Sequence, residues 1–253
     1  MPKLVACVPV RDEEWILAKC LSDLSTYVDE IVALDDGSCD RSLEILKSFP
    51  KVAAIHVNPP GTRPFGNGCE ANNRNKLLDL ARDRKAEIIL QIDSDEVFSD
   101  SIKVELPKII ALKSSTKFQI VHLYGDMDHF RVDGDWGGFF RYRLFWMNRR
   151  LRFTPQPVIA TPKAFDRKHK ITCYSAKIVH FAWLDINTRT KHLKRYFEVY
   201  KMKNPGKSVS FEEFSSSEAM LSELRIVKQD NSQVITNTWA EVMGKESQEK
   251  YRL

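Results

Sequence analysis

The sequence Ile88-Ile89-Leu90-Gln91-Ile92-Asp93-Ser94-Asp95-Glu96 joins an apolar run of strand length to a cluster of three carboxylates. An apolar strand of this kind is typical of a parallel sheet that helices cover on both faces. Ligands of such sheets bind beyond the carboxyl ends of the strands, where Asp93 and Asp95 would lie. Two adjacent carboxylates repel each other unless a cation joins them, and their oxygens favour Mg2+ or Mn2+. A solvated acidic turn before a helix fits the stretch equally well, so the neighbouring segments must decide.

The composition indicates a globular protein. With 253 residues, 43% of them hydrophobic and 29% charged, the chain has enough core for one large or two small domains. No apolar run approaches the roughly 18 to 20 residues that a membrane span requires. The N-terminus lacks the layout of a signal peptide. Five scattered cysteines show no metal-ligand spacing, which favours reduced thiols and a cytoplasmic location.

Charge is distributed unevenly along the chain. The net charge is +5, but residues 141–207 hold 17 Lys and Arg against three Asp and Glu, a balance of +14. Aromatic residues alternate with these basic residues. A solvated face over core aromatics explains the pattern, and so does a surface that binds polyanions such as nucleotide phosphates, a phosphorylated glycolipid, a membrane leaflet or nucleic acid.

The first 95 residues alternate between strand and helix patterns. This alternation predicts an α/β fold with a parallel sheet and right-handed crossovers. Asp12 is expected to cap the first helix and Asp40 the second. The expected strands are 4–10, 30–34, 52–57 and a last one that leads to Asp93; the expected helices are 13–25, the segment after Asp40, and 70–84; and the segment 58–68 is expected to be a loop.

Acidic residues follow several of the predicted strands. Asp12, Asp35 with Asp36, and Asp93 with Asp95 would converge on one edge of the sheet. Neither a Gly-x-Gly-x-x-Gly motif nor a P-loop follows the first strand. The sequence therefore favours a nucleotide site in which a metal bridges carboxylates to a diphosphate.

Four segments carry a resemblance to a known family: VPVRDEE at 8–14, DEIVALDDGSCD at 29–40, ANNRN at 71–75 and QIDSDE at 91–96. In order and spacing they are similar to motifs of the family 2 glycosyltransferases, and QIDSDE resembles the DxD motif of that family. The resemblance implies the GT-A fold, a mostly parallel sheet flanked by helices. It also implies transfer of a sugar from a nucleotide-diphosphate donor, most simply a UDP-sugar, with Mn2+ or Mg2+ as cofactor.

The resemblance further implies roles for individual residues. Asp95 would hold the metal that stabilises the leaving diphosphate, and Asp93 would bind that metal through water or bind a ribose hydroxyl. Arg74 would pair with the base or a phosphate. The remaining implied site residues are Pro9, Arg11 and Asp36 around the base, Ser94 between the two aspartates, and His180 as a further metal ligand or, alternatively, a core histidine.

The second half resembles the transferases that build lipooligosaccharide cores, through RYRLF at 141–145, RF at 152–153 and VHFAW at 179–183. Those enzymes usually carry His-Glu after the RLFR segment, whereas this chain has PVIATP at 157–162. An inverting transfer needs another base. Asp135, beside Trp136 in a segment that also holds Asp126, Asp128 and Asp133, is the candidate. A retaining enzyme needs no dedicated base, and solvated loop acids also explain the cluster.

The expected organisation is a nucleotide-sugar half at 1–100, an acceptor half of mixed α+β structure at 101–207 and a helical extension at 208–253. The acceptor is expected to be a polyanion, such as a phosphorylated glycan or glycolipid at the inner membrane face. Two alternatives remain open. One is a phage-type transferase that modifies hydroxymethylated bases in DNA, and the other is a binding module without catalysis. A nucleotidyltransferase would normally open with a Gly-rich loop, which is absent here. The identity of the sugar and the oligomeric state stay undecided at this level.

Overall fold

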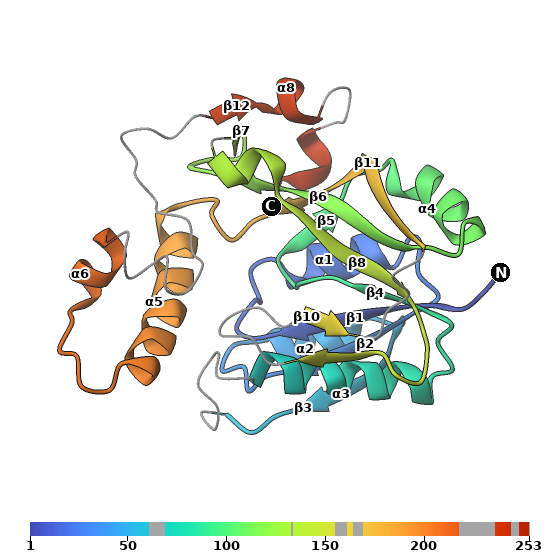
Figure 1. Cartoon of the computed structure of the whole chain (residues 1–253), viewed down its shortest axis with the longest axis horizontal. Coiled ribbons are helices and arrows are strands. Elements are labelled where there is room, and N and C mark those ends of the chain that lie inside the picture. The colour runs from blue at the N-terminus through green and yellow to red at the C-terminus, as the bar shows by residue number, and fades with distance from the viewer. Residues whose placement is uncertain are drawn as a thin grey trace.

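One half of the central sheet is parallel, as the alternating pattern predicts. A computed structural model describes residues 1–60, 69–132, 134–154, 161–163, 169–217, 236–243 and 248–252. The parallel strands lie side by side in the order β3-β2-β1-β4 (Figure 1). Their bounds are β1 Leu4–Val10, β2 Glu30–Asp35, β3 Val52–Val57 and β4 Ile88–Gln91. The predicted α/β class is confirmed.

Both faces of this half are covered because the side chains of β1 alternate between two cores. Leu4, Ala6 and Val8 join the core that contains α1 (Leu17–Leu24) and α4 (Ile102–Ala111). Val5 and Cys7 join the core under α3 (Cys69–Asp83). Burial on both faces explains why these strands read as continuous apolar runs.

The second half of the chain extends the same sheet. β8 pairs with β4 and β6 in antiparallel fashion, and β11 lies parallel to β6 and antiparallel to β5. The bounds are β5 Glu96–Phe98, β6 Ser115–Leu123, β7 His129–Arg131, β8 Phe140–Trp146 and β11 Lys170–His180; β9 (Arg152–Thr154) and β10 (Thr161–Lys163) form a separate pair. A short 3-10 helix, η1, covers Gly134–Gly138.

Two helices lie beside the sheet. α5 (Ile186–Lys203) and α6 (Phe211–Ser216) stand to the left of the sheet in Figure 1 and share a small core around Tyr200 and Phe214. Both helices begin with capping boxes, set by Asp185 and Ser210. α5 begins at Ile186, shortly after β11 ends at His180. Its first turns therefore lie near the strand ends.

The described C-terminal region contains one short strand besides the helices that the sequence predicts. β12 (Thr236–Thr238) pairs with β7, and it is followed by α8 (Trp239–Met243) and the 3-10 helix η2 (Gln248–Tyr251). Tyr251 is fully buried. Residues 218–235 lie outside the described part. The described C-terminal segments thus add an edge strand and close one side of the core.

The predicted cap at Asp12 is wrong. α1 begins at Leu17, not at 13, and no side chain caps it. Asp12 has a φ of +52° and joins two loops instead: its N–H donates to Ser38 Oγ, and its Oδ1 accepts from the N–H of Cys39. Asp40 accepts from the N–H of Ser42, the first residue of α2 (Ser42–Ser48), but the N-cap position is Arg41, so the predicted cap at Asp40 is wrong as well. The Asp12 contacts tie the end of β1 to the loop after β2.

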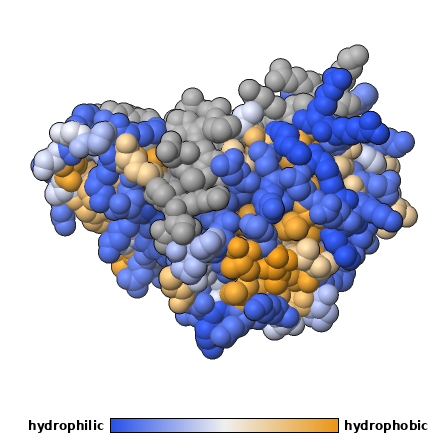
Figure 2. All heavy atoms as spheres, turned by 90° about the horizontal axis from the view of Figure 1, so that it is seen from below, coloured by the Kyte–Doolittle hydropathy of each residue, from blue (hydrophilic) through white to orange (hydrophobic). Residues whose placement is uncertain are grey.

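β3 forms an edge of the sheet and is half-buried along most of its length. Its residues are mainly apolar, and Val57 is 47% exposed. Figure 2 shows an apolar patch on the underside of the molecule, where β3 lies in Figure 1. Within the described residues, no helix has the length and apolar character needed to cross a membrane.

Candidate active site

The DxD segment forms the turn between β4 and β5. β4 ends at Gln91, and β5 begins at Glu96, so Asp93, Ser94 and Asp95 lie beyond the carboxyl end of a central parallel strand. The turn is held from both sides: the N–H of Asp93 donates to Glu96 Oε2, and the carbonyl of Asp95 accepts from the N–H of Phe181. Ser94 and Asp95 are both buried. The two aspartates therefore occupy fixed positions at the strand ends.

Each carboxylate oxygen of Asp93 accepts a hydrogen bond from an arginine. Arg74 Nη2 on α3 lies 2.8 Å from Oδ1, and Arg143 Nη2 on β8 lies 3.0 Å from Oδ2. Burial alone would raise the pKa of Asp93, but the two guanidinium groups outweigh it and hold the pKa well below its usual range. Asp93 is thus an anchor for two buried cations.

The same arginines continue into a buried ion network. Arg74 donates to Glu70 Oε1 and Gln91 Oε1, and Arg143 donates to Glu96 Oε1. Burial raises the pKa of Glu96, although Arg143 acts in the opposite direction. Arg74 therefore lies beside the DxD segment, and its planar fork is engaged by protein groups.

Two imidazoles flank Asp95. Its Oδ2 lies 3.3 Å from His180 Nε2 and 3.5 Å from His192 Nε2. Burial alone would raise the pKa of Asp95, but the two histidines hold it well below its usual value. In return, and against the effect of burial, the Asp95 carboxylate raises the pKa of His180 to about 8. Burial lowers the pKa of His192. Asp95 is therefore ionised at neutral pH.

Glu13 completes a group that sequence reasoning did not assign. One ligand atom each from Glu13, Asp95 and His192 lies within 4.8 Å of the others. Burial and the nearby Asp95 raise the pKa of Glu13, while two cations of α5 lower it. These are Lys191 Nζ at 3.3 Å and Arg195 Nη2 at 3.2 Å from Glu13 Oε1. The sequence shows that Glu13 follows the first strand and that His192 lies in the second half of the chain. Only the position of α5 brings these two side chains together.

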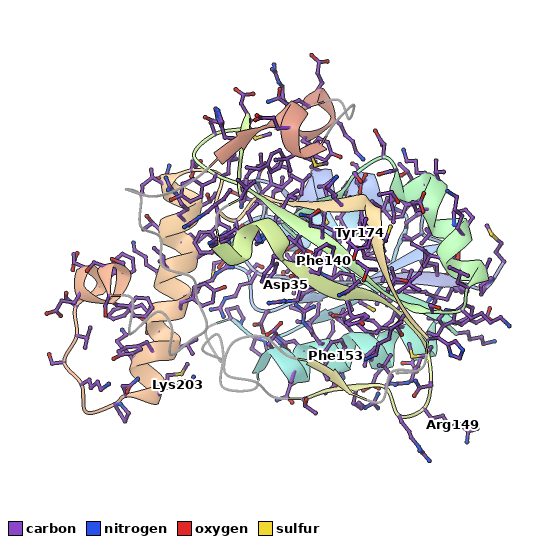
Figure 3. All side chains as sticks on the ribbon, turned by 45° about the horizontal axis from the view of Figure 1, so that its top comes forward. Asp35, Phe140, Arg149, Phe153, Tyr174 and Lys203 are labelled. Carbon is purple, nitrogen blue, oxygen red and sulfur yellow. The ribbon has the colours of Figure 1, made fainter. Side chains whose placement is uncertain are left out.

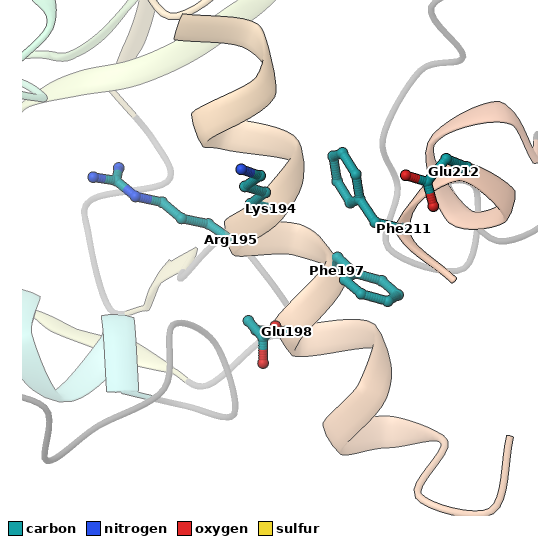
Figure 4. Close-up of a pocket in the computed structure, with 6 residues that line it drawn as sticks. All are labelled: Lys194, Arg195, Phe197, Glu198, Phe211 and Glu212. Atoms are coloured by element: carbon teal, nitrogen blue, oxygen red, sulfur yellow. The ribbon is translucent and has the colours of Figure 1, made fainter. Parts of the chain in front are cut away.

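α5 is docked onto the loop after β1 through polar contacts. Arg195 Nη2 donates to the carbonyl of Arg11 at 2.6 Å, and Lys191 Nζ donates to the carbonyl of Asp12. Figure 4 shows Arg195 on the side of α5 that faces away from α6. An open groove of about 570 Å3 lies between α5 and α6, lined by Lys194, Arg195, Phe197, Glu198, Phe211 and Glu212. One lining residue, Arg195, also pairs with Glu13 of the carboxylate cluster.

The residues expected around the base gather at the ends of β1 and β2. Asp36 Oδ1 accepts from Asn58 Nδ2 at 2.6 Å, and its Oδ2 lies 3.9 Å from Arg11 Nη1. Pro9 pairs with Leu34 across these strands. The turn after Asp36 depends on Gly37, whose φ is +77°. Pro9, Arg11 and Asp36 thus lie at the neighbouring ends of β1 and β2.

The candidate base is only partly described. Asp135 belongs to η1, but its side chain lies outside the described part of the structure, as does the whole of Asp133. The next residue, Trp136, is buried and packs edge-on against His122 with ring centroids 4.6 Å apart. Asp126 is engaged at the surface, 2.9 Å from His129 Nδ1.

The basic side chains of the segment 141–207 that the structure describes lie in several different places. Arg143, Lys191 and Arg195 pair with carboxylates of the site. Figure 3 shows Arg149 and Lys203 at opposite ends of the molecule. Part of the charge therefore neutralises the acidic cluster, and the rest is spread over distant exposed positions.

A family model gives the decisive match. The model described as Glycosyl transferase family 2 matches residues 5–177, which include β1 to β8 and most of β11. The chain belongs to glycosyl transferase family 2. This assignment confirms the family, the GT-A fold class and the type of enzyme that the four motifs predict. No protein in the curated set matches the chain.

Solved structures of glycosyltransferases are similar at low identity. Glucosyl-3-phosphoglycerate synthase from Mycobacterium tuberculosis, in complex with Mn2+, UDP and glucosyl-3-phosphoglycerate, is 17% identical with a TM-score of 0.35. That match covers 48% of this chain and 44% of the synthase, so the matched part is less than half of that protein. S. aureus TarS 1-349 in complex with UDP-GlcNAc is 15% identical, with a TM-score of 0.44, over 90% of this chain and 77% of the other.

Proposed function

We propose that this family 2 glycosyltransferase transfers a sugar from a nucleoside-diphosphate donor, a UDP-sugar, in a reaction that depends on a divalent metal. The observation that carries the proposal is the meeting of Glu13, Asp95 and His192 at the carboxyl ends of the strands. Two carboxylates and one imidazole suit Mn2+, and the oxygens alone suit Mg2+. The residues present therefore fit the metal that the family implies.

A bound metal of this kind stabilises the negative charge that gathers on the leaving diphosphate. The protein's own groups hold the donor around it. Asp36 accepts hydrogen bonds from the base, in the pocket that Pro9 and Arg11 line. Arg74 offers a planar fork to a phosphate or the base once the donor competes with Asp93 for it. Asp93 and Ser94 then lie against the ribose and diphosphate.

The acceptor hydroxyl must lose a proton during an inverting transfer. We assign Asp135 to this step because it directly precedes Trp136 in the chain, and Trp136 packs against His122. Residues 1–100 supply the donor half of the site, and residues 101–207 supply its acceptor half. Residues 208–253 form an extension.

The proposed acceptor is a polyanion, namely a phosphorylated glycan or glycolipid at the inner membrane face. Exposed basic residues support this choice on two parts of the surface. They are Arg149, Arg150 and Arg152 around the start of β9, and Lys201, Lys203 and Lys207 at the end of α5. Cations at separate places suit an extended anionic acceptor.

Thermal stability in the presence of donors tests the proposal. UDP-, GDP-, CMP- and dTDP-sugars are compared with and without Mn2+. A ligand at 100 times its Kd should raise Tm by about 5 to 10 °C in a protein of this size. We expect this shift for UDP-sugars with Mn2+ only. Asp95→Asn should lose it, and the control Asp126→Asn, at a surface ion pair, should keep it. The absence of any donor-dependent shift in the native protein would overturn the proposal.

A further inference from the structure

We infer that His122 is a positioning residue, which acts through His180 to fix the metal-binding carboxylate of Asp95. The inference rests on the metal site proposed above. Three side chains form one hydrogen-bonded row. His180 Nε2 lies 3.3 Å from Asp95 Oδ2, and His180 Nδ1 lies 2.8 Å from His122 Nδ1. His122 and His180 are register partners on the parallel strands β6 and β11.

The row uses both ring nitrogens of His180. An imidazole with one bonded nitrogen can still rotate or change tautomer, whereas bonds at both nitrogens fix its plane. The contact between the two Nδ1 atoms needs one donor and one acceptor. A neutral His180 that donates from Nε2 to Asp95 accepts at Nδ1, and a charged His180 donates from both nitrogens. The row is therefore continuous in either form of His180.

The surroundings of His122 show that this histidine does more than fill space. The residue is only 4% exposed, and its ring packs edge-on against Trp136 and Phe139. Within the described residues, its Nε2 has no hydrogen-bond partner. A phenylalanine would fill this apolar position without the cost of burying an unpaired nitrogen. The contact with His180 is what distinguishes histidine here.

The two imidazoles beside Asp95 thus have different roles. His192 belongs to the group with Glu13 and Asp95, whose ligand atoms lie within 4.8 Å of one another. His180 has its second nitrogen on His122. The structure assigns His192 to the metal and His180 to the orientation of Asp95, in place of the ligand role that the resemblance implies for His180. Residues that orient a metal ligand typically contribute 10- to 100-fold to metal affinity.

Mn2+ affinity of the full-length protein, measured by the electron paramagnetic resonance of free Mn2+, tests this inference without any sugar donor. His122→Phe keeps a ring of similar size and removes the nitrogen that contacts His180 Nδ1. We expect its Kd for Mn2+ to rise about 10- to 100-fold. His122→Asn places an amide atom near the Nδ1 position and should restore the Kd to within about threefold of the native value. The exposed His129→Phe is the control and should leave the Kd unchanged.

Further variants separate positioning from packing. Melting temperatures of all variants are recorded, because a merely structural role would change Tm and leave the Kd unaltered. His122→Gln is polar like Asn but carries its amide one carbon further out, so it should bind Mn2+ about tenfold more weakly than His122→Asn. This comparison holds even where His122→Phe does not fold.

The outcomes distinguish the two proposals. Native-like Mn2+ affinity in His122→Phe or His122→Gln, together with loss of binding in Asp95→Asn, would overturn the positioning role and leave the metal site intact. Absence of Mn2+ binding by the native protein would overturn the metal site and the positioning role with it.

Discussion

Asp93, in the turn after β4, and Arg143, on β8, form a partly buried ion pair between segments that are distant in sequence: Arg143 Nη2 lies 3.0 Å from Asp93 Oδ2. The same nitrogen bonds Glu96, and Arg74 takes the other oxygen of Asp93. Both carboxylate oxygens of Asp93, the first aspartate of the DxD motif, therefore accept from guanidinium groups. Asp95, the second aspartate, lies beside two histidines. The two acids of one short motif thus have different partners and different roles.

Removal of Arg143 should destabilise the protein strongly. Arg143→Met leaves the buried carboxylate of Glu96 and the partly buried carboxylate of Asp93 without this cation, and loss of one partner of a buried pair typically costs about 3 to 5 kcal/mol. Urea denaturation measures the free energy of unfolding. The control is Arg41→Met, because Arg41 pairs with Glu14 at the exposed surface and should cost at most about 1 kcal/mol. Similar losses in the two variants would contradict the importance of burial.

Gly37→Ala should destabilise the turn that carries Asp36. Gly37 has a φ of +77°, and an added Cβ would lie 2.8 Å from the carbonyl oxygen of Pro59. Strain of this kind costs about 1 to 3 kcal/mol, and it should also weaken donor binding. Gly206→Ala is the control, because nothing lies within 4 Å of its added Cβ. Equal stabilities of the two variants in thermal unfolding would be the contrary result.

Tyr251 should anchor the C-terminal segment. Its side chain is fully buried, and its hydroxyl donates to the carbonyl of Phe98 at 3.4 Å. By analogy with other large aromatic side chains, Tyr251→Ala should cost about 3 to 5 kcal/mol through the cavity that it leaves. Tyr251→Phe keeps the ring and should cost about 1 kcal/mol. A loss in Tyr251→Phe as large as in Tyr251→Ala would show that the hydroxyl, not the packing, holds the segment.

Glu30 should make stability sensitive to acid. Hydrogen bonds from Arg84, partly opposed by burial, and from Lys3 lower the pKa of Glu30 from 4.5 to about 2. A folded-state pKa below the unfolded one stabilises the protein above pH 4.5, and this contribution is lost as the pH falls from 4.5 to about 2. Glu30→Gln should flatten the decline in Tm over this range. Arg84→Gln should do the same to a lesser extent, and an unchanged slope in both variants would refute the assignment.

Local patterns determined the parallel half of the fold. Strands 4–10 and 52–57 were predicted with the bounds that β1 and β3 have, because both are apolar, β-rich runs, although only β1 is buried on both faces. The start of α1 was predicted too early. Asp12 bonds Ser38 and Cys39 in a loop that comes 26 residues later, and no local pattern carries that contact.

The sequence by itself placed acids at the ends of these strands, because the carboxyl ends of parallel strands must share an edge. It thereby predicted the family, which the family model confirms, and it placed the proposed donor site and Asp95 at that edge. Only the tertiary structure decided which side chains contact these acidic residues. Glu13, Asp95 and His192 meet because α5 returns across the loop after β1, and Arg143 reaches Asp93 because β8 inserts beside β4. The charge on a side chain is local, but the group that neutralises it depends on how distant segments pack.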